Sequence, residues 1–295
     1  MSLPSRKFPD MGYRSEPFIG SQAIANLDLT RGELRWNHRA LLPDVYLHKD
    51  APRDLRARTR AAWLWTGRKG IIAGQAAAAI HTRGPLDDDT PVELIARARR
   101  PQCGVIIRTE RIDADEIAAW HHMLITSPER TALDLARFLP PELAICLLDR
   151  LAYKTAITED DLYRLADRYR GARGIDTARQ VMYLMDAGAA NPEESTLRLA
   201  LHEAGLPRPE TDINVGVWPD SARISLGWRR FKVGIHVESD PPPTDRTLIN
   251  LAAAAAERRA IHGWLILTAT PQRDVGQLIS SVRQALRQAR ARTPG

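Results

Sequence analysis

The stretch FKVGIHVESD, residues 231–240, constrains the fold of this chain more than any other. Its first half is apolar and β-branched, which is typical of a buried strand. Three polar residues then follow at alternate positions, His236, Glu238 and Asp240, and alternation places them on one face of a strand. The pattern predicts a buried strand that ends either in a cluster of metal ligands or in a solvated structural edge.

The segments around this stretch predict an α/β domain over residues 191–295. NPEESTLRLALHEAGL is an amphipathic helix with Asn191 as its N-cap, Pro192 in its first turn and Gly205 at its C-terminal end. The strand-like runs ETDINVGVW and ARISLGW come next. Beyond FKVGIHVESD lie an alanine-rich helical segment over 245–262, the strand WLILTAT and the terminal helix VGQLISSVRQALRQARAR.

The other end of the chain predicts a small helical head over residues 18–50. SQAIANLDL reads as a short helix and turn, and Thr30 with Glu33 forms a capping box that opens a second helix. Two helices joined in this way follow the helix-turn-helix pattern, and the basic hairpin HRALLPDVYLHKD is compatible with a wing. The side chains expected to reach DNA are Arg31, Arg35, Asn37 and Arg39. A helical hairpin without a nucleic acid role is the alternative.

Residues 51–190 predict a mixed region of helices and short strands. Residues 54–83 read as helices, whereas PVELIA and GVIIRTE are β-branched runs that read as strands. The adjacent histidines His121 and His122 are expected in a helix, where neighbouring side chains point in different directions.

The second half of this region predicts helices alone. TSPERTALDLARFL has Ser127 as a cap and Pro128 at the first helical position. Helices continue over residues 140–190, with breaks at the proline pair 140–141 and at RGARG.

Composition narrows the function classes. The 295 residues are 44% hydrophobic and carry a net charge of +6, which favours a polyanionic partner. Apolar runs of about 18 residues are absent, and the N-terminal segment has no apolar core of a secretory signal, so neither a membrane span nor export is expected. Cys103 and Cys146 are isolated, which favours reduced thiols in the cytoplasm. Basic residues cluster at 53–60, 97–100, 164–179, 229–232 and 283–292.

Residues 18–290 resemble an actinobacterial two-part family. The first part is similar to AbiEi-like antitoxins of type IV toxin–antitoxin systems, through FIGSQAIANLDLTRGELR, LLPDVYL, IAGQAAAAIH, PVELI, GVIIR and TSPERTALDLAR. The second part resembles very-short-patch-repair-type endonucleases of the PD-(D/E)XK, restriction-endonuclease-like fold. That likeness is carried by NPEESTLRLALHEAGLPRPETDINV, ARISLGWRRFKVGIHVESD, TDR, GWLIL and the closing helix.

The resemblance implies a chain of α+β and α/β parts. The expected order is a flexible leader over 1–17, a winged-helix-like head over 18–50, an antitoxin-like region over 51–190 and a restriction-endonuclease-like mixed sheet flanked by helices over 191–295. The family's active site places one glutamate on the helix, an aspartate on one strand and acidic residues on the next.

The departures from that pattern concern the acidic residues. Glu194 matches the helix glutamate and Asp240 is retained, but Ser225 stands where the aspartate is expected. His236 replaces the strand glutamate, Glu238 replaces the second acid, and prolines 241–243 replace a polar loop. Serine removes an anionic ligand, and Mg²⁺ binds imidazole poorly.

We therefore expect a nuclease fold that has lost magnesium-dependent cleavage, with no cofactor. The open alternative is residual catalysis by Glu194, Glu238 and Asp240 with Mg²⁺ or Mn²⁺, the metal being held by Glu194, His236 and Glu238.

The expected function is that of a DNA-binding, antitoxin-like regulatory protein, with DNA and a cognate toxin protein as partners. Two alternatives stay open at this point. One is a metal-dependent DNA endonuclease with an altered active site, and the other is an interaction scaffold that binds a toxin rather than DNA.

Overall fold

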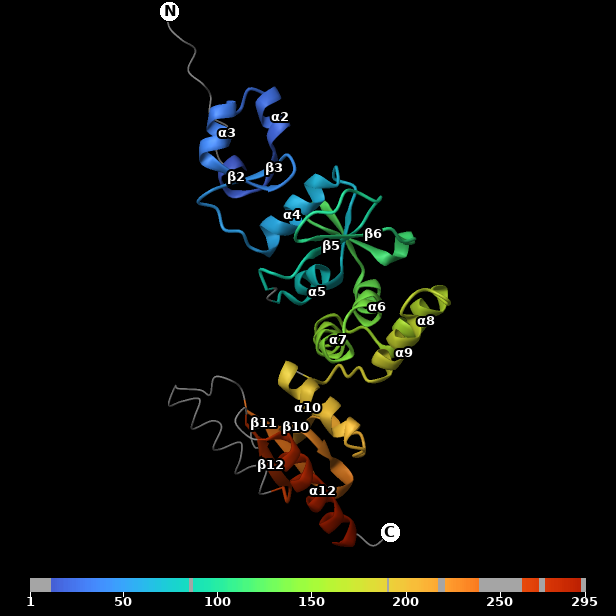
Figure 1. The fold of residues 1–295 in the computed structure, drawn as a ribbon. Helices are drawn as coiled ribbons and strands as arrows, with labels where there is room; N and C mark the ends of the chain where they lie inside the picture. The colour runs from blue at the N-terminus through green and yellow to red at the C-terminus, as the bar shows by residue number, and fades with distance from the viewer. Residues whose placement is uncertain are drawn as a thin grey trace, which may run out of the picture. The chain divides into compact units, whose positions relative to one another are not determined.

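The computed structural model describes residues 12–84, 87–189, 191–216, 221–238, 262–270 and 274–292. The chain forms two compact units, one from residues 1–137 with 164–170 and the other from 138–163 with 171–295. Both units combine helices with strands, which confirms the predicted α+β class (Figure 1). Across the described ranges, no helix has the length and apolar character needed to cross a bilayer. Asp240, prolines 241–243 and the alanine-rich segment 245–261 lie outside the described residues.

The first unit begins with the head. Its elements are α1 (Gly12–Ser15), β1 (Phe18–Ile19), α2 (Gly20–Ala25), α3 (Arg31–Asn37), β2 (His38–Leu42) and β3 (Val45–His48). The strands are antiparallel in the order β1-β3-β2. The predicted capping box is confirmed, since Thr30 Oγ1 accepts a hydrogen bond from Glu33 N and the Glu33 carboxylate accepts one from Thr30 N. The capping box thus determines where α3 begins. The buried Leu34 of α3 packs against Phe18.

Helix α1 lies inside the segment that the sequence analysis assigned to a flexible leader over 1–17. The Tyr13 hydroxyl donates to the Asp28 carboxylate at 2.6 Å, and the Tyr13 ring meets Phe18 edge-on. This hydrogen bond raises the pKa of Tyr13 to about 12. The described end of the leader is therefore part of the head, because its aromatic ring completes the head's small core.

The second part of this unit is a mixed sheet with helices. Its elements are α4 (Leu55–Trp65), β4 (Ile71–Ala73), α5 (Gly74–Thr82), β5 (Val92–Ile95), β6 (Val105–Arg108), the 3-10 turn η1 (Ala114–Glu116), β7 (Ile117–Trp120), β8 (Met123–Thr126) and α6 (Pro128–Phe138). The strands lie in the order β6-β5-β4-β8-β7. The strands predicted from PVELIA and GVIIRTE are confirmed as β5 and β6. Ser127 Oγ accepts from Arg130 N, which confirms the predicted cap.

Two predictions in this region were wrong. Residues 71–73 form the central strand β4 rather than part of a helix, because Ile71 and Ile72 pair with β5 on one side and β8 on the other. His121 and His122 lie in the tight β7–β8 turn rather than in a helix, and His121 has a positive φ of 52°.

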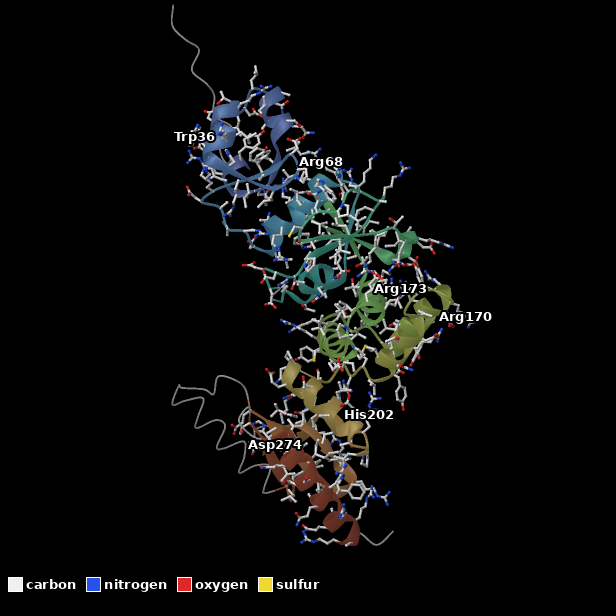
Figure 2. All side chains as sticks on the ribbon, viewed as in Figure 1. Trp36, Arg68, Arg170, Arg173, His202 and Asp274 are labelled. Carbon is white, nitrogen blue, oxygen red and sulfur yellow. The ribbon has the colours of Figure 1, made fainter. Side chains whose placement is uncertain are left out.

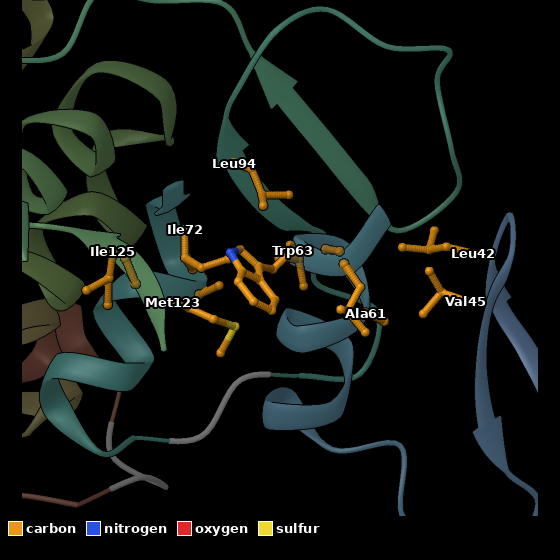
Figure 3. Packing of buried hydrophobic residues seen from close by; sticks show 13 residues of the cluster. Leu42, Val45, Ala61, Trp63, Ile72, Leu94, Met123 and Ile125 are labelled. Atoms are coloured by element: carbon orange, nitrogen blue, oxygen red, sulfur yellow. The ribbon is translucent and has the colours of Figure 1, made fainter. Parts of the chain in front are cut away.

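The core of this unit surrounds Trp63 of α4. Trp63 packs with Ile72, Leu94 and Met123 of the sheet (Figure 3). Leu42 and Val45, from the β2–β3 hairpin, belong to the same buried cluster and lie near Ala61 of α4 in the figure. The head therefore shares a hydrophobic core with the sheet region. Burying apolar surface at this junction stabilises both parts together.

The second unit combines a helical layer with a second sheet. Its elements are α7 (Pro141–Thr155), α9 (Ile175–Tyr183), α10 (Pro192–Glu203), β9 (Glu210–Val215), β10 (Ala222–Trp228), the 3-10 turn η2 (Arg229–Phe231), β11 (Val233–Val237), β12 (Leu265–Ala269) and α12 (Val275–Arg292), and α8 (Glu159–Arg168) runs from this unit into the first. The sheet order is β12-β11-β10-β9, with β11 and β12 parallel and the other pairs antiparallel. The helix breaks predicted at 140–141 and RGARG are confirmed.

One face of this sheet is covered by α10 and α12. Leu197 and Leu201 of α10 and Val282 of α12 form one cluster with Val233 and Ile235 of β11. The Asn191 cap is confirmed, because its side chain accepts from Glu194 N. Gly205 follows the helix with φ +71°, as a terminating glycine requires.

The boundary between the units differs from the predicted one at 191. Asp149 of α7 accepts a hydrogen bond from Arg198 of α10 at 2.6 Å, and both side chains are buried. Burial raises the pKa of the Asp149 carboxyl, against the lowering effect of Arg198. Since separating this pair would leave buried charges unpaired, α7 belongs with α10 and the division falls near 138.

Candidate functional site

Glu194, the predicted helix glutamate, lies in the first turn of α10 and is fully buried. Its two carboxylate oxygens accept hydrogen bonds from Arg223 Nη1 at 2.9 Å and Nη2 at 3.0 Å. The third guanidinium nitrogen, Nε, donates to Asp212 at 2.6 Å. Arg223 thus joins a helix glutamate to an aspartate of the neighbouring strand β9.

Arg223 supplies the positive charge of this site. The hydrogen bond that Arg223 donates to Glu194 raises the pKa of Arg223 above its usual value, against the effect of burial, so the guanidinium stays charged. A bidentate guanidinium uses both carboxylate oxygens at once. Glu194 therefore has its counter-charge from within the protein, in the place where the resemblance implies a divalent cation.

Ser225, which stands at the expected aspartate position, is also buried. Its hydroxyl oxygen accepts a hydrogen bond from Val237 N at 3.1 Å. On either side of Ser225 the strand changes its packing, since Ile224 clusters with Ile213 whereas Leu226 clusters with α10 and α12. The serine hydroxyl thus joins β10 to β11 where the strand is irregular, a structural role that needs no metal.

His236 and Glu238 do not join Glu194. Val233, Ile235 and Val237 face α10 and α12, so alternation directs the half-buried His236 to the opposite face of the sheet. Glu238 is exposed and lines a pocket whose α10 wall is formed by Pro192, Glu193, Thr196, Leu197 and Ala200. Glu193, rather than Glu194, therefore lines the same pocket as Glu238.

The residues do not fit a hard divalent cation. Within the described ranges, one group of three or more candidate ligands has its atoms within 4.8 Å of one another, namely Asp113, Asp115 and Glu116. Glu194, His236 and Glu238 therefore do not form the metal set that the sequence suggested. Of the predicted catalytic trio, Glu194 is paired with Arg223 and Glu238 is exposed, while Asp240 lies outside the described residues.

The Asp113, Asp115 and Glu116 group is matched by arginines. Arg111 pairs with Asp113, Arg168 with Asp115 and Arg130 with Glu116, at 2.6–3.0 Å. Each carboxylate thus has an arginine partner, and Arg130 also binds other acids. A metal ion bound here would have to displace a guanidinium, so we assign these acids to structure.

The first unit holds a buried ionic network that the sequence analysis did not identify. Arg130 of α6 is fully buried and donates to Asp134 at 2.9 Å, Glu116 at 2.7 Å and Glu110 at 2.8 Å, and its guanidinium stacks on the Tyr169 ring. Burial raises the pKa of Asp134 to about 6, which outweighs the lowering effect of Arg130. The spacing of Arg130 and Asp134, four residues apart within an apolar helix, is the signal that could have revealed the network.

The head presents the residues expected to reach DNA on α3. Arg31, Arg35 and Asn37 are exposed, and so is Trp36, whose side chain points outward in Figure 2 with 72% of its surface accessible. Arg39 differs, because it is half-buried on β2 and its Nη2 donates to the Ala51 carbonyl at 2.6 Å. Arg39 thus ties the hairpin to the segment that follows it.

Sequence reasoning missed Arg223 and Trp36. Arg223 lies two positions before Ser225 on the same strand. An arginine close to the position that lacks the expected acid was the available signal. Trp36 follows Arg35 in a helix with a single buried position, Leu34, which already predicts an exposed ring.

Comparisons with known proteins give distant relatives. The chain is similar to two uncharacterized proteins of Mycobacterium tuberculosis, one from strain CDC 1551 / Oshkosh and one from strain ATCC 25618 / H37Rv. Each is 28% identical over 141 residues, which is 48% of this chain and 51% of the relative. The match thus spans about half the length of these curated relatives. Neither a family model nor a solved structure matches the chain.

Proposed function

We propose that this chain is a DNA-binding, antitoxin-like regulatory protein whose second unit carries a nuclease-like fold without metal-dependent cleavage. The proposal rests on one observation about the head. Two arginines, an asparagine and a tryptophan of the capped helix α3 are exposed to solvent.

The arrangement of the head supports this function. α2 and α3 are joined by the segment 26–30, and the β2–β3 hairpin follows α3 directly, in the place of a wing. In helix-turn-helix proteins the second helix lies in the major groove and reads base edges. α3 is seven residues long, or about 10 Å, which is sufficient for two turns of contact with a groove.

The side chains of α3 are of the types that recognise bases and contact phosphates in DNA complexes. Arg31 and Arg35 are four residues apart and share one face of the helix. Arginine contacts guanine bidentately and asparagine contacts adenine in the same way, so Asn37 at the end of α3 is a candidate base reader. Lys49 Nζ donates to the Trp36 carbonyl at 2.6 Å and adds a cation at the C-terminal end of the helix.

The ion pair of Glu194 with Arg223 supports the second half of the proposal. Metal-dependent nucleases need free carboxylates to hold the ion against the scissile phosphate. Here the helix glutamate binds a guanidinium instead. We therefore assign the second unit to binding or partner contact rather than to cleavage.

The test is a binding titration with labelled duplex DNA across salt concentrations. We expect the affinity of the wild-type protein to fall steeply with salt, and Arg31→Gln/Arg35→Gln to flatten the slope of log affinity against log salt by ~1.8, or about 0.9 per lost phosphate contact. The control is Arg170→Gln/Arg173→Gln, which removes the same charge from exposed positions labelled in Figure 2.

Two outcomes would count against the proposal. A folded wild-type protein that binds no duplex at about 50 mM salt would favour the alternative of a scaffold that binds a toxin protein. Equal losses in the α3 variant and its control would mean that net charge, rather than α3, attracts the DNA.

A further inference from the structure

A second basic surface lies at one end of the sheet in the second unit. The turn η2 joins β10 to β11, and together with the start of β12 and the end of α12 it encloses an open groove. Apolar side chains form its floor, namely Phe231, Val233, Leu265 and Ala289. The rim is cationic and comprises Arg229, Arg230, Lys232 and Arg292.

The rim cations face solvent, and most of them are not neutralised by acids. All four are exposed, and the described residues that line the groove include no carboxylate. Arg229 is the rim cation that is paired with an acid, because its Nε donates to Glu210 at 2.8 Å. Arg230, Lys232 and Arg292 thus remain as a positive set drawn from two separate elements.

An aromatic ring contacts Arg230 of this set and the nearby Arg290 of α12. The Phe231 ring carries the guanidinium of Arg230 at 5.8 Å from its centroid and that of Arg290 at 5.5 Å. Phe231 is itself half-buried against the sheet. Cation–π contact thus orients arginines from the η2 turn and from α12 around one anchored ring, which reduces the entropy lost when they bind an anion.

The groove is distant from the nuclease-like residues. Lys232 lies at the start of β11, whereas Val237, which bonds Ser225, lies five residues further along. At about 3.3 Å per residue the strand separates the two ends by roughly 16 Å. The cations therefore belong to a surface of their own.

We propose that this groove binds the phosphate backbone of nucleic acid as a second DNA contact of the chain. The choice of DNA as the ligand of this groove rests on the proposed function. A rim whose cations come from two elements of an open groove suits a linear polyanion, because successive phosphates can reach successive cations. Arginine, which supplies most of the rim, binds phosphate oxygens bidentately.

The test uses the full chain and the same salt titration with labelled duplex DNA. Arg230→Gln/Arg292→Gln removes two rim cations while keeping polar side chains at exposed positions. We expect this variant to flatten the salt slope by ~1.8 relative to the wild-type protein. Arg170→Gln/Arg173→Gln, with the same charge change, should keep the wild-type slope. Inorganic phosphate added at constant ionic strength should not displace the DNA.

The outcomes separate the groove from the head. If the groove variant keeps the wild-type slope while Arg31→Gln/Arg35→Gln loses affinity, the groove proposal is overturned and the proposed function stands. If the groove variant flattens the slope while the α3 variant does not, the groove is supported and the assignment of DNA contact to α3 fails. Displacement by inorganic phosphate would overturn the groove proposal in favour of a compact anion site.

Discussion

The carboxylate of Glu194 is bound by both terminal nitrogens of Arg223 and is inaccessible to solvent. An acid at the start of α10 and a base on β10 therefore form an ion pair in the second unit. Since Arg223 also binds Asp212, one guanidinium fixes α10 against two neighbouring strands. This ion pair thus links the helix to the sheet.

Arg223→Met should therefore destabilise the protein. Removing the guanidinium leaves the buried Glu194 carboxylate without its counter-charge, and fully buried pairs lose about 3–5 kcal/mol in this way. Because the Arg223 side chain is 38% exposed, water can compensate in part, and we expect a loss of about 2 kcal/mol. Urea unfolding measures it. Glu194→Gln/Arg223→Met should recover part of the loss, and a single variant as stable as the wild-type protein would contradict the role of the pair.

The purified protein should not nick supercoiled plasmid DNA with Mg²⁺ or Mn²⁺. The reason is that the described acids of the predicted site do not converge, since Glu194 is paired with Arg223 and Glu238 is exposed. The described acidic cluster of Asp113, Asp115 and Glu116 is paired with arginines. The comparison is Glu238→Ala, which removes the exposed acid of the predicted site. Nicking that requires Mn²⁺ and disappears in this variant would favour the endonuclease alternative, whereas nicking that persists would indicate a contaminating nuclease.

The buried network of the first unit predicts a pH dependence of stability. Burial raises the pKa of Asp134 from 3.8 to about 6, so the folded protein binds this proton more tightly than the unfolded chain does. The resulting stabilisation is fully present below pH 3.8 and is lost as the pH rises through 6. Between about pH 5 and 7.5 the wild-type protein should lose about 1 kcal/mol relative to Asp134→Asn. If the difference in unfolding free energy between the two proteins stays constant across this pH range, the raised pKa of Asp134 is contradicted.

Local signals in the sequence predicted much of the fold. The Thr30–Glu33 box, the Asn191 cap and the terminating Gly205 each depend on residues within one helical turn, and all three are confirmed. β4 was missed because three residues, IIA, precede an alanine-rich helix without a break. Its strand character comes from pairing with β5 and β8, which are distant in sequence.

The candidate site depended on long-range contacts and was predicted less well. The departures from the acidic pattern at Ser225 and His236 were visible in the sequence, and they raised the expectation of lost cleavage. The partner of Glu194 was not visible, since Arg223 lies 29 residues away and meets it only when α10 packs on β10. The division into compact units near residue 138 was not visible for the same reason, because the Asp149–Arg198 contact spans 49 residues.

The capping box of α3 gives a last prediction, which links the stability of the head to its proposed function. Thr30→Ala removes the acceptor of Glu33 N and should cost about 1 kcal/mol, whereas Thr30→Ser keeps the hydroxyl and should cost little. Since α3 is only seven residues long, the loss should appear as faster amide hydrogen exchange within α3. DNA affinity should fall in parallel, because a frayed helix presents Arg31 and Arg35 in fewer binding conformations. Equal exchange in the alanine and serine variants would show that the core around Leu34, rather than the cap, holds the helix.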